Sequence, residues 1–513
     1  MTVRWGRCLN FSKCKEANQK QHIPIATGDP FVCPECAQRL VDESDLVPNE
    51  AHATPRKPDK KSPNTLLIAA VVVLLLAVVA GFARWGMHLG AKATTTKTIL
   101  RLAGSNTIGD TLGPSLAEAF LKEQGAADVR ILPGANPLEK IVEGVLPGDS
   151  APSSITIAAH GSATAFTALA ENSCDIGMAS RKIKPDEAAK LASLGNMTSV
   201  ANEHILGLDG IAVIVNAANP ANQLDKDKIM RIFTGGITDW SQVGANRGAI
   251  KVYARNDNSG TYDTFKTLVL GGKPLAAGAQ KIEDSKALSD AVAGDPNGIG
   301  FIGLPYIASS KPIAVSDKGT LALLPTRLTV GTEDYLLSRR LFLYTPANPV
   351  NTYTRQFIAF AISSKGQDVV ASTGFVAQNV AQVEQTVPAD APAEYKSLTQ
   401  DANRLSLNFR FASGQMDLDN KAKVDLDRVV SLIADLNIPE DKIMLFGFSD
   451  STGNYASNQE LSLSRAQVVE RQLILRGLKP SIVRGFGSNL AVASNAGDEG
   501  QAKNRRVEVW IRK

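Results

Sequence analysis

Three short segments place hydroxyl-bearing residues and glycine at points where a helix should begin. They are Ser105 to Thr107, Gly161 to Thr164, and Ser259 to Thr261, and Arg255 and Asp257 come just before the third. The first turn of a helix leaves backbone N–H groups unpaired at the positive end of the helix dipole, and hydroxyl groups add further donors. One such segment is typical of an ordinary N-cap. Three in one region, with an arginine beside the last, predict a cradle for a small oxyanion.

The elements that must position these segments form an alternation of apolar strands and helical patterns, from about residue 98 to residue 386. Strand-like runs such as ILRLAGS, SITIAAHGS and DIGMAS are separated by helical runs such as TLGPSLAEAFLKEQ. This alternation predicts an α/β domain. In open α/β sheets, ligands bind beyond the carboxyl ends of the strands, against helix N-termini. We therefore expect the three segments to converge on one ligand.

The same region resembles a known family through an ordered series of motifs. They are GSNTIG, HGSATAFTALAENSCDIGMASRKI, DGIAVIVNAANP, IMRIFTGGITDWSQVG, YARNDNSGTYDTF and GDPNGIGFIGLPYI. In this order they are similar to the periplasmic phosphate-binding proteins of ABC importers, which have the type 2 periplasmic binding fold. The resemblance implies an α/β clamp of two hinged lobes, with crossing strands that begin near Asp209 and Arg339.

The resemblance also implies which residues contact the anion. They are Thr107, Ile108, Ser162, Arg255, Ser259, Gly260 and Thr261. From this chain's own residues we add Ser105, Arg181 and Asp257 to the candidate anion-binding residues. Arg255 would supply a forked pair of donors, because a guanidinium matches two oxygens of one anion. Asp257 is expected to orient Arg255.

One position departs from the family pattern and leaves the selectivity open. Arg181 follows DIGMAS, where a carboxylate can accept the proton of hydrogen phosphate and so reject sulfate. We expect an arginine there to bind any dianion without discriminating between phosphate and sulfate. Phosphate selectivity would then need Asp209 or Asp257 as the acceptor.

The last region, 403–513, begins with a strand and a turn and continues with the helical pattern KAKVDLDRVVSLIADL, which predicts an α+β domain. By spacing alone, Asp450 and Arg465 could form a surface salt bridge. The ordered motifs GFSDSTG, LSLSRA, GFGS and NRRVEV, however, resemble the OmpA-type peptidoglycan-binding domain. The resemblance implies that Asp450, Asn458 and Arg465 bind the diaminopimelate of a stem peptide. Gln501 stands where this family often has arginine.

Four cysteines lie near the start of the chain in two close pairs, Cys8 with Cys14 and Cys33 with Cys36. Two such pairs are typical of a small zinc ribbon, in which four thiolates hold one structural Zn²⁺. A unit as short as residues 1–44 needs the free energy of metal binding in order to fold. Two disulfides in an oxidising compartment are the alternative.

The run Leu66 to Ala83 carries no charge and no proline, and as a helix it spans about 27 Å. We expect a single transmembrane helix over 65–86, preceded by a disordered linker over 45–64; a cleaved signal peptide is the alternative. Reduced thiolates imply that the N-terminus lies in the cytosol. We therefore expect an inner-membrane protein whose residues after about 87 face the periplasm. Cys174 is then expected to be a buried apolar residue.

Composition excludes several functions. The net charge of +4 is small for 513 residues, and no basic stripe suggests nucleic-acid binding. His88, His160 and His204 are too scattered for a catalytic or hydrolytic metal site, so we expect a binding protein and not an enzyme.

The leading hypothesis is a membrane-anchored receptor for phosphate or a similar oxyanion. A linker at 387–402 would separate its clamp (98–386) from a domain tethered to peptidoglycan, and the receptor would deliver to ABC permease subunits. The alternative is a non-transport anion sensor or a structural protein of the cell envelope.

Overall fold

A computed structural model describes residues 3–7, 23–26, 32, 33, 36, 40–42, 96–257, 259–411 and 416–513. The chain forms two compact units, Met1–Lys92 and Ala93–Lys513. The predicted linker at 45–64 and the predicted transmembrane helix at 65–86 lie outside the described residues. Within the described part of the chain, no helix combines the length and the hydropathy that a membrane crossing requires.

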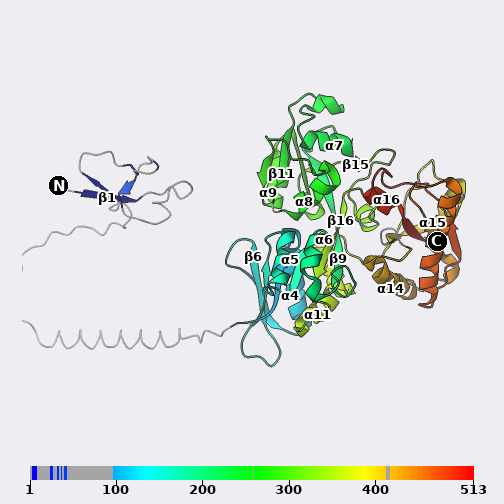
Figure 1. Ribbon diagram of the computed structural model, residues 1–513, viewed down its shortest axis with the longest axis horizontal. Helices are drawn as coiled ribbons and strands as arrows, with labels where there is room; N and C mark the ends of the chain where they lie inside the picture. Colours follow the sequence, from blue (N-terminus) through cyan, green and yellow to red (C-terminus); the bar gives the residue numbers. More distant parts are fainter. Residues whose placement is uncertain are drawn as a thin grey trace, which may run out of the picture. The chain divides into compact units, whose positions relative to one another are not determined.

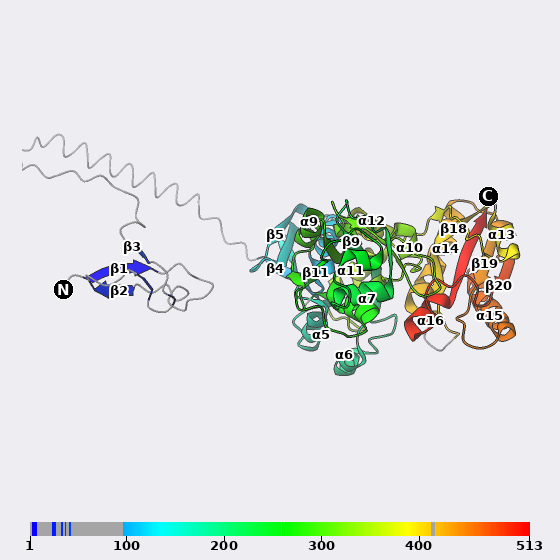
Figure 2. The ribbon, with the colours of Figure 1, turned by 90° about the horizontal axis from the view of Figure 1, so that it is seen from above.

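The first unit contains a small antiparallel sheet in the order β2-β1-β3 (Figure 2). Its strands are β1 (Val3–Arg7), β2 (Ile23–Ala26) and β3 (Val41–Asp42). Ile23, Cys33 and Leu40 are buried. Cys8 and Cys14 are outside the described residues, and among those described no group of three or more potential metal ligands is found. The zinc site therefore stays a prediction.

The second unit begins with a clamp whose sheet has the order β12-β11-β13-β9-β16-β8-β4-β7-β6-β5, with β14 paired to β9 (Figure 1). Lobe 1 contains β4 (Lys97–Gly104), β5 (Ala127–Pro133), β6 (Glu139–Val145), β7 (Ser153–Ala158) and β8 (Ile176–Ala179). Lobe 2 contains β11 (Lys251–Arg255), β12 (Gln280–Ile282), β13 (Gly298–Gly303) and β14 (Lys311–Pro312), and a small parallel sheet of β10 (Gln223–Asp225) and β15 (Ala314–Ser316).

Helices cover both faces of this sheet. Those of lobe 1 are α3 (Asn106–Gly109), α4 (Leu112–Glu123), α5 (Ser162–Ala170), α6 (Pro185–Lys190), η2 (Ala192–Leu194), α11 (Thr352–Ile362) and α12 (Ser364–Ser372). Those of lobe 2 are α7 (Lys226–Phe233), η3 (Trp240–Val243), α8 (Gly260–Phe265), η4 (Lys266–Leu270), α9 (Ser285–Gly294), η5 (Leu304–Tyr306) and α10 (Arg327–Gly331). Each lobe has its own apolar core. Cys174 is buried in lobe 1, and burial raises the pKa of its thiol to about 12, which confirms the expectation of an apolar role.

Two strands cross between the lobes, β9 (Glu203–Val215) and β16 (Ser338–Tyr344). The end of β9 pairs with β13 in lobe 2, and its beginning pairs with β16 in lobe 1. Arg339 lies directly opposite Asp209 in this register. The crossing strands expected from the sequence are therefore confirmed, and the two charged residues come to the junction of the lobes.

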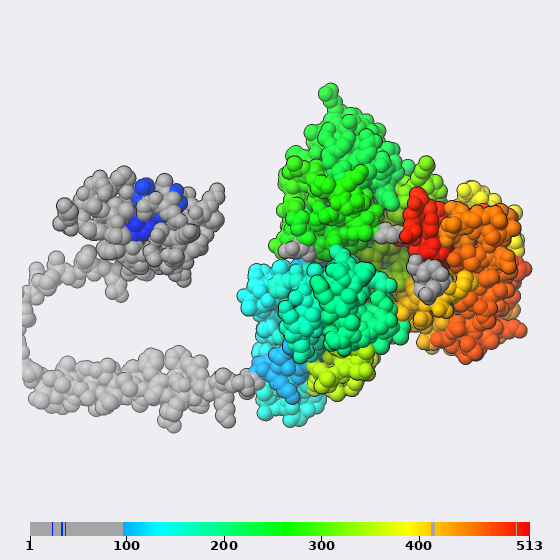
Figure 3. Space-filling model, in the orientation of Figure 1, coloured from blue at the N-terminus to red at the C-terminus, as the bar shows by residue number. Residues whose placement is uncertain are grey.

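The C-terminal domain, coloured from yellow to red in Figure 3, has a five-stranded sheet in the order β17-β18-β21-β19-β20. Its strands are β17 (Gln382–Val383), β18 (Ala402–Arg410), β19 (Ile443–Gly447), β20 (Ile482–Gly485) and β21 (Arg506–Arg512). Its helices are α13 (Ala393–Thr399), α14 (Asn420–Asp435), η6 (Glu440–Lys442), α15 (Tyr455–Ile474) and α16 (Asp498–Asn504).

The expected linker at 387–402 is wrong, because this segment is folded into the C-terminal domain. The α13 side chain Tyr395 is buried against Phe446, Phe486 and Trp510, and its hydroxyl donates to Glu508 at 2.8 Å. One aromatic anchor thus outweighs the proline-rich composition around it. Among the described residues, the segment between the clamp and β18 is therefore held against the C-terminal domain.

Candidate functional site

Two buried guanidinium groups lie where the lobes of the clamp meet. Arg255, at the end of β11, is 4% exposed and Arg339, at the start of β16, is 6% exposed. Arg255 donates from Nη1 to the Ser285 hydroxyl at 2.6 Å, but its Nε is buried without a partner, and so is Nη1 of Arg339. Burial lowers the pKa of Arg255, and the positive charge of Arg339 lowers it further. The pair therefore presents positive charge with unused donors.

Arg339 joins the two lobes. Its Nε and Nη2 donate to Asp209 Oδ2 at 3.0 and 2.6 Å, and Nη2 also donates to the hydroxyls of Thr261 at 2.9 Å and Thr107 at 3.3 Å. The other Asp209 oxygen accepts from the Leu304 N–H at 3.0 Å. The Thr107 and Thr261 hydroxyls, from α3 of lobe 1 and α8 of lobe 2, are 3.4 Å apart. The first and third predicted segments thus converge.

The second predicted segment reaches the same place through Ser162, the first residue of α5. The Ser162 hydroxyl accepts from the Ser180 N–H at 3.0 Å and lies 3.2 Å from the Ser180 hydroxyl. A Cβ added to Gly260 would lie 2.7 Å from Ser162 Oγ and 2.2 Å from Ser180 Oγ. Only glycine therefore allows α8 to approach lobe 1 this closely, and all three segments meet as predicted.

Three further predicted residues take different positions around the site. Ser259 is the N-cap of α8, since its hydroxyl oxygen accepts from the N–H groups of Thr261 and Tyr262. Ser105 Oγ is buried without a hydrogen-bond partner and can serve a ligand. Ile108 packs its side chain into the core of lobe 1, so only its backbone could contact an anion.

Asp257 does not orient Arg255, and that prediction is wrong. Its side chain is 69% exposed and forms an ion pair with Lys281, with oxygen-to-Nζ distances of 2.8 and 2.7 Å. Lys281 lies on β12, which runs parallel to β11, so it reaches Asp257 at the edge of the sheet. Ser285 holds Arg255 instead.

The donors of Arg181 are not free for a dianion, which corrects a second prediction. It donates to both oxygens of Glu187 at 2.8 and 2.6 Å and pairs with Asp263 at 2.8 Å. Burial acts to lower the pKa of Arg181, but Glu187 and Asp263 outweigh it and raise the pKa. Glu187 lies on α6 of lobe 1, and Asp263 lies on α8 of lobe 2. Arg181 therefore links the two lobes.

A cavity of about 540 Å³ opens beside Arg255. Its lining includes Asn106, Asp110, Asn136, Lys140, Glu283 and Asp284. The cavity has room for a small anion next to the arginine, and its wall mixes these polar residues, three of them acids, with apolar ones such as Pro137 and Leu138.

The C-terminal domain brings together the charged residues implied by its resemblance. Asp450 follows β19 and accepts from the Thr452 N–H at 2.9 Å and from Arg505 Nη1 at 3.1 Å. Asn458 and Arg465 are buried on α15. Burial tends to raise the pKa of Asp450, but the hydrogen bonds from Thr452 and Arg505 outweigh it and lower the pKa.

Arg465 does not form the surface salt bridge that spacing alone allowed. Burial lowers its pKa to about 10, its Nη1 donates to the Phe448 carbonyl at 3.4 Å, and its Nε is buried without a partner. Ser449 Oγ is also buried without a partner. The charge of Asp450 acts to raise the pKa of Arg465, but Asp450 is paired with Arg505, so Nε of Arg465 stays available to a ligand.

Sequence reasoning missed two site residues. Arg339 was assigned only to a crossing strand, although a charge inside the apolar run RRLFLYT needs a partner, and Asp209 in DGIAVIVN is the matching acid. Arg505, in the motif NRRVEV, pairs with Asp450 from the other end of the domain. A search for opposite charges within apolar strands would have found the first pair.

Comparisons with known proteins agree with this architecture. The model of the PBP superfamily domain matches residues 91–365, and that of the OmpA family matches residues 410–505. The phosphate-binding protein PstS of Staphylococcus aureus (strain bovine RF122 / ET3-1) is 29% identical over 238 residues, which cover 45% of this chain and 71% of that protein.

Two solved structures are also similar to this chain. An ABC-type phosphate transport receptor from Vibrio cholerae is 24% identical, with a TM-score of 0.43 and coverage of 54% of this chain and 99% of that one. PstS from Borrelia burgdorferi is 22% identical, with a TM-score of 0.38 and coverage of 55% and 98%.

The matched families contain binding proteins and not enzymes, which confirms that part of the prediction. The two-lobed clamp and the C-terminal domain expected from the motifs are confirmed as well. Because the first family model spans more than half of the chain, the protein belongs to the PBP superfamily and carries a C-terminal domain of the OmpA family.

Proposed function

We propose that the clamp binds phosphate, or a similar tetrahedral oxyanion, where its two lobes meet. The observation that carries this proposal is the set of buried donors without partners, namely Arg255 Nε, Arg339 Nη1 and Ser105 Oγ. A buried donor left unpaired costs about 1–3 kcal/mol, and more when it is charged. An oxyanion would supply the missing acceptors and relieve the repulsion between the two arginines. The name of the Staphylococcus aureus relative supports phosphate.

The site supports weak discrimination between phosphate and sulfate. Rejection of sulfate needs an acceptor that faces the proton of hydrogen phosphate. Asp209 Oδ2 already accepts two hydrogen bonds from Arg339, Oδ1 is held by the Leu304 N–H, and Asp257 is turned away toward Lys281. We therefore expect the affinities for the two dianions to differ by less than about a hundredfold.

Titration calorimetry tests this function. Phosphate should bind to the wild-type chain, and Arg255→Ala should abolish the binding. Asp257→Asn is the matched control, because it removes a charge two residues away that is exposed and paired with Lys281. Equal phosphate binding by the wild type and the Arg255 variant would refute the proposed site.

The C-terminal domain is proposed to bind the diaminopimelate of peptidoglycan stem peptides. Asp450 would receive the ammonium group of this zwitterion, and Arg465 would donate to its carboxylate from the unpartnered Nε. Ser449 Oγ offers a further hydrogen bond, and Asn458 lines the same end of α15. The match to the OmpA family supports this assignment.

Membrane anchoring and transport belong to the same proposal. The chain would cross the inner membrane once over 65–86, with Cys8, Cys14, Cys33 and Cys36 holding Zn²⁺ in the cytoplasm and both large domains in the periplasm. Delivery to an ABC importer rests on the sequence motifs of the clamp. Phosphate uptake by cells tests the transport role. Uptake should be lower than in wild-type cells both in cells that lack the chain and in cells that express only the Arg255→Ala variant.

An anion sensor is the second candidate, and one observation favours it. The C-terminal domain is docked by buried charges on the segment that leads into crossing strand β16, through ion pairs to Glu333 and Asp334. A receptor that only delivers its ligand needs no such contact. Unchanged phosphate uptake after deletion of the chain would favour sensing.

A further inference from the structure

The C-terminal domain contacts both lobes of the clamp. On lobe 2 it binds Glu333 and Asp334, which follow α10 and precede β16. On lobe 1, Asn420 Nδ2 donates to the Thr198 carbonyl at 2.9 Å and to Glu203 Oε1 at 3.0 Å. The domain therefore contacts both lobes next to the two crossing strands, β9 and β16.

The contact with lobe 2 is a buried network of charges. Glu333 accepts from Arg410 Nε at 3.0 Å, and Asp334 accepts from Arg404 at 3.0 Å and from Asn408 at 2.9 Å. Burial tends to raise the pKa of both carboxyls, but the arginines outweigh it and lower both pKa values. Separating one partner from a buried ion pair leaves an uncompensated charge and strongly destabilises the protein. The network therefore favours the docking geometry in which all of its pairs are formed.

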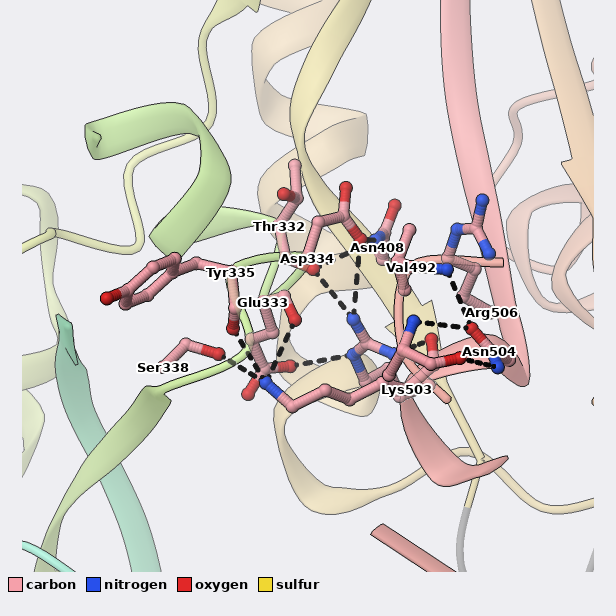
Figure 4. Close-up of polar contacts among 12 residues, drawn as sticks. Thr332, Glu333, Asp334, Tyr335, Ser338, Asn408, Val492, Lys503, Asn504 and Arg506 are labelled. Carbon is pink, nitrogen blue, oxygen red and sulfur yellow. Dashed lines mark hydrogen bonds and ion pairs between the residues drawn. The ribbon is translucent and has the colours of Figure 1, made fainter. Parts of the chain in front are cut away.

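Lys503 of α16 holds the turn that leads to the anion site (Figure 4). Its Nζ donates to the Tyr335 carbonyl and to the Ser338 hydroxyl, both at 2.8 Å, and to the Glu333 carbonyl at 3.3 Å. Ser338 is followed directly by Arg339, whose guanidinium lies in the anion site. A lysine of one domain thus positions an anion-binding residue of the other.

The residues next to Lys503 reach the proposed peptidoglycan site. Asn504 Oδ1 accepts from the N–H groups of Val492 at 2.8 Å and Ala493 at 3.1 Å, which fixes this segment in its own domain (Figure 4). Arg505 Nη1 then donates to Asp450 at 3.1 Å. Three consecutive residues therefore connect the turn before Arg339 with the carboxylate of the peptidoglycan site.

We propose that anion binding and stem-peptide binding are coupled through Lys503, so that filling one site changes the affinity of the other. The inference rests on the proposed ligands of both sites. A clamp that opens about its crossing strands shifts residues 335–339 relative to lobe 1, and a domain bound to both lobes cannot follow both. Some docking contacts then differ between the open and closed states, and the segment from Lys503 to Arg505 carries this difference to Asp450, which is what coupling requires.

Calorimetry on the full chain tests the coupling. Inorganic phosphate is titrated with and without a saturating soluble stem peptide that contains diaminopimelate, and the stem peptide is titrated with and without phosphate. The dissociation constants should change by the same factor in both directions, and we expect a change of at least about fivefold. A factor of one in both directions, with both ligands bound, would overturn this inference alone. Absence of phosphate binding would overturn both this inference and the proposed function.

Variants assign the coupling to Lys503. Lys503→Gln should reduce the factor to about one while both ligands still bind, and Lys503→Arg should restore part of it. The control is Lys479→Gln, because Lys479 is an exposed lysine of the same domain. Ser338→Ala is a milder test that keeps the lysine and removes one acceptor. Full coupling in Lys503→Gln and Ser338→Ala, with unchanged melting temperatures, would contradict the assignment.

Discussion

Alanine substitutions of Arg255 and Arg339 should separate ligand binding from fold stability. Arg255 has no carboxylate partner within the described site and is repelled by Arg339, so its removal should change the free energy of unfolding by less than about 1 kcal/mol. The same change removes a charge-assisted fork worth about 3–6 kcal/mol for two hydrogen bonds, which is at least a hundredfold in affinity. Arg339→Ala should lose affinity too, but it also leaves Asp209 buried and unpaired, at a cost of about 3–5 kcal/mol.

Urea unfolding and calorimetry measure the two effects on the same samples. The double variant Arg339→Met with Asp209→Leu should recover much of the lost stability, because replacing both members of a buried pair by apolar side chains of similar volume is often nearly neutral. It should not recover phosphate binding. The reasoning is refuted if Arg255→Ala is as unstable as Arg339→Ala, or if the double variant binds phosphate like the wild type.

Four further outcomes are expected. Arg181→Gln should weaken phosphate and sulfate binding by a similar factor, because it cuts a link between the lobes and does not touch the anion; a changed ratio of the two constants in calorimetry would contradict this. Burial lowers the pKa of His204 to about 4 from 6.5, so its neutral form contributes stability that is present above pH 6.5 and lost as the pH falls toward 4. That loss should approach about 3 kcal/mol in urea unfolding and should be absent in His204→Gln. Asp450→Ala or Arg465→Ala should each leave the chain in the supernatant when isolated peptidoglycan is sedimented, and sedimentation as with the wild type would exclude the site. The four N-terminal cysteines should hold about one zinc ion per chain by metal analysis, whereas stable disulfides without metal would reverse the proposed topology.

Much of the clamp could be predicted from local sequence patterns. Hydroxyl and glycine residues mark helix starts locally, and helix starts of open α/β sheets gather around ligands, so the convergence of Thr107, Ser162 and Thr261 could be predicted. Ion pairs of long side chains were less predictable. Arg181 pairs with Glu187 and Asp263 because tertiary structure brings the acids to it, and nothing local showed this.

The relation between the two large domains was not visible in the sequence. Composition made 387–402 look like a linker, yet Tyr395 anchors this segment in the aromatic core of the C-terminal domain. The charges that dock the domain on the clamp, such as Arg410 and Glu333, are 77 positions apart. Charges this distant are indistinguishable from surface residues until the fold brings them together.

The central claim is that the junction of the two lobes binds a tetrahedral oxyanion through Arg255 and Arg339. Titration of phosphate and of sulfate into the full chain tests it most directly. The account predicts that both anions bind at one site per chain, with affinities that differ by less than about a hundredfold and that vanish in Arg255→Ala. Binding of neither anion to the wild type, or unchanged binding to the Arg255→Ala variant, would contradict it.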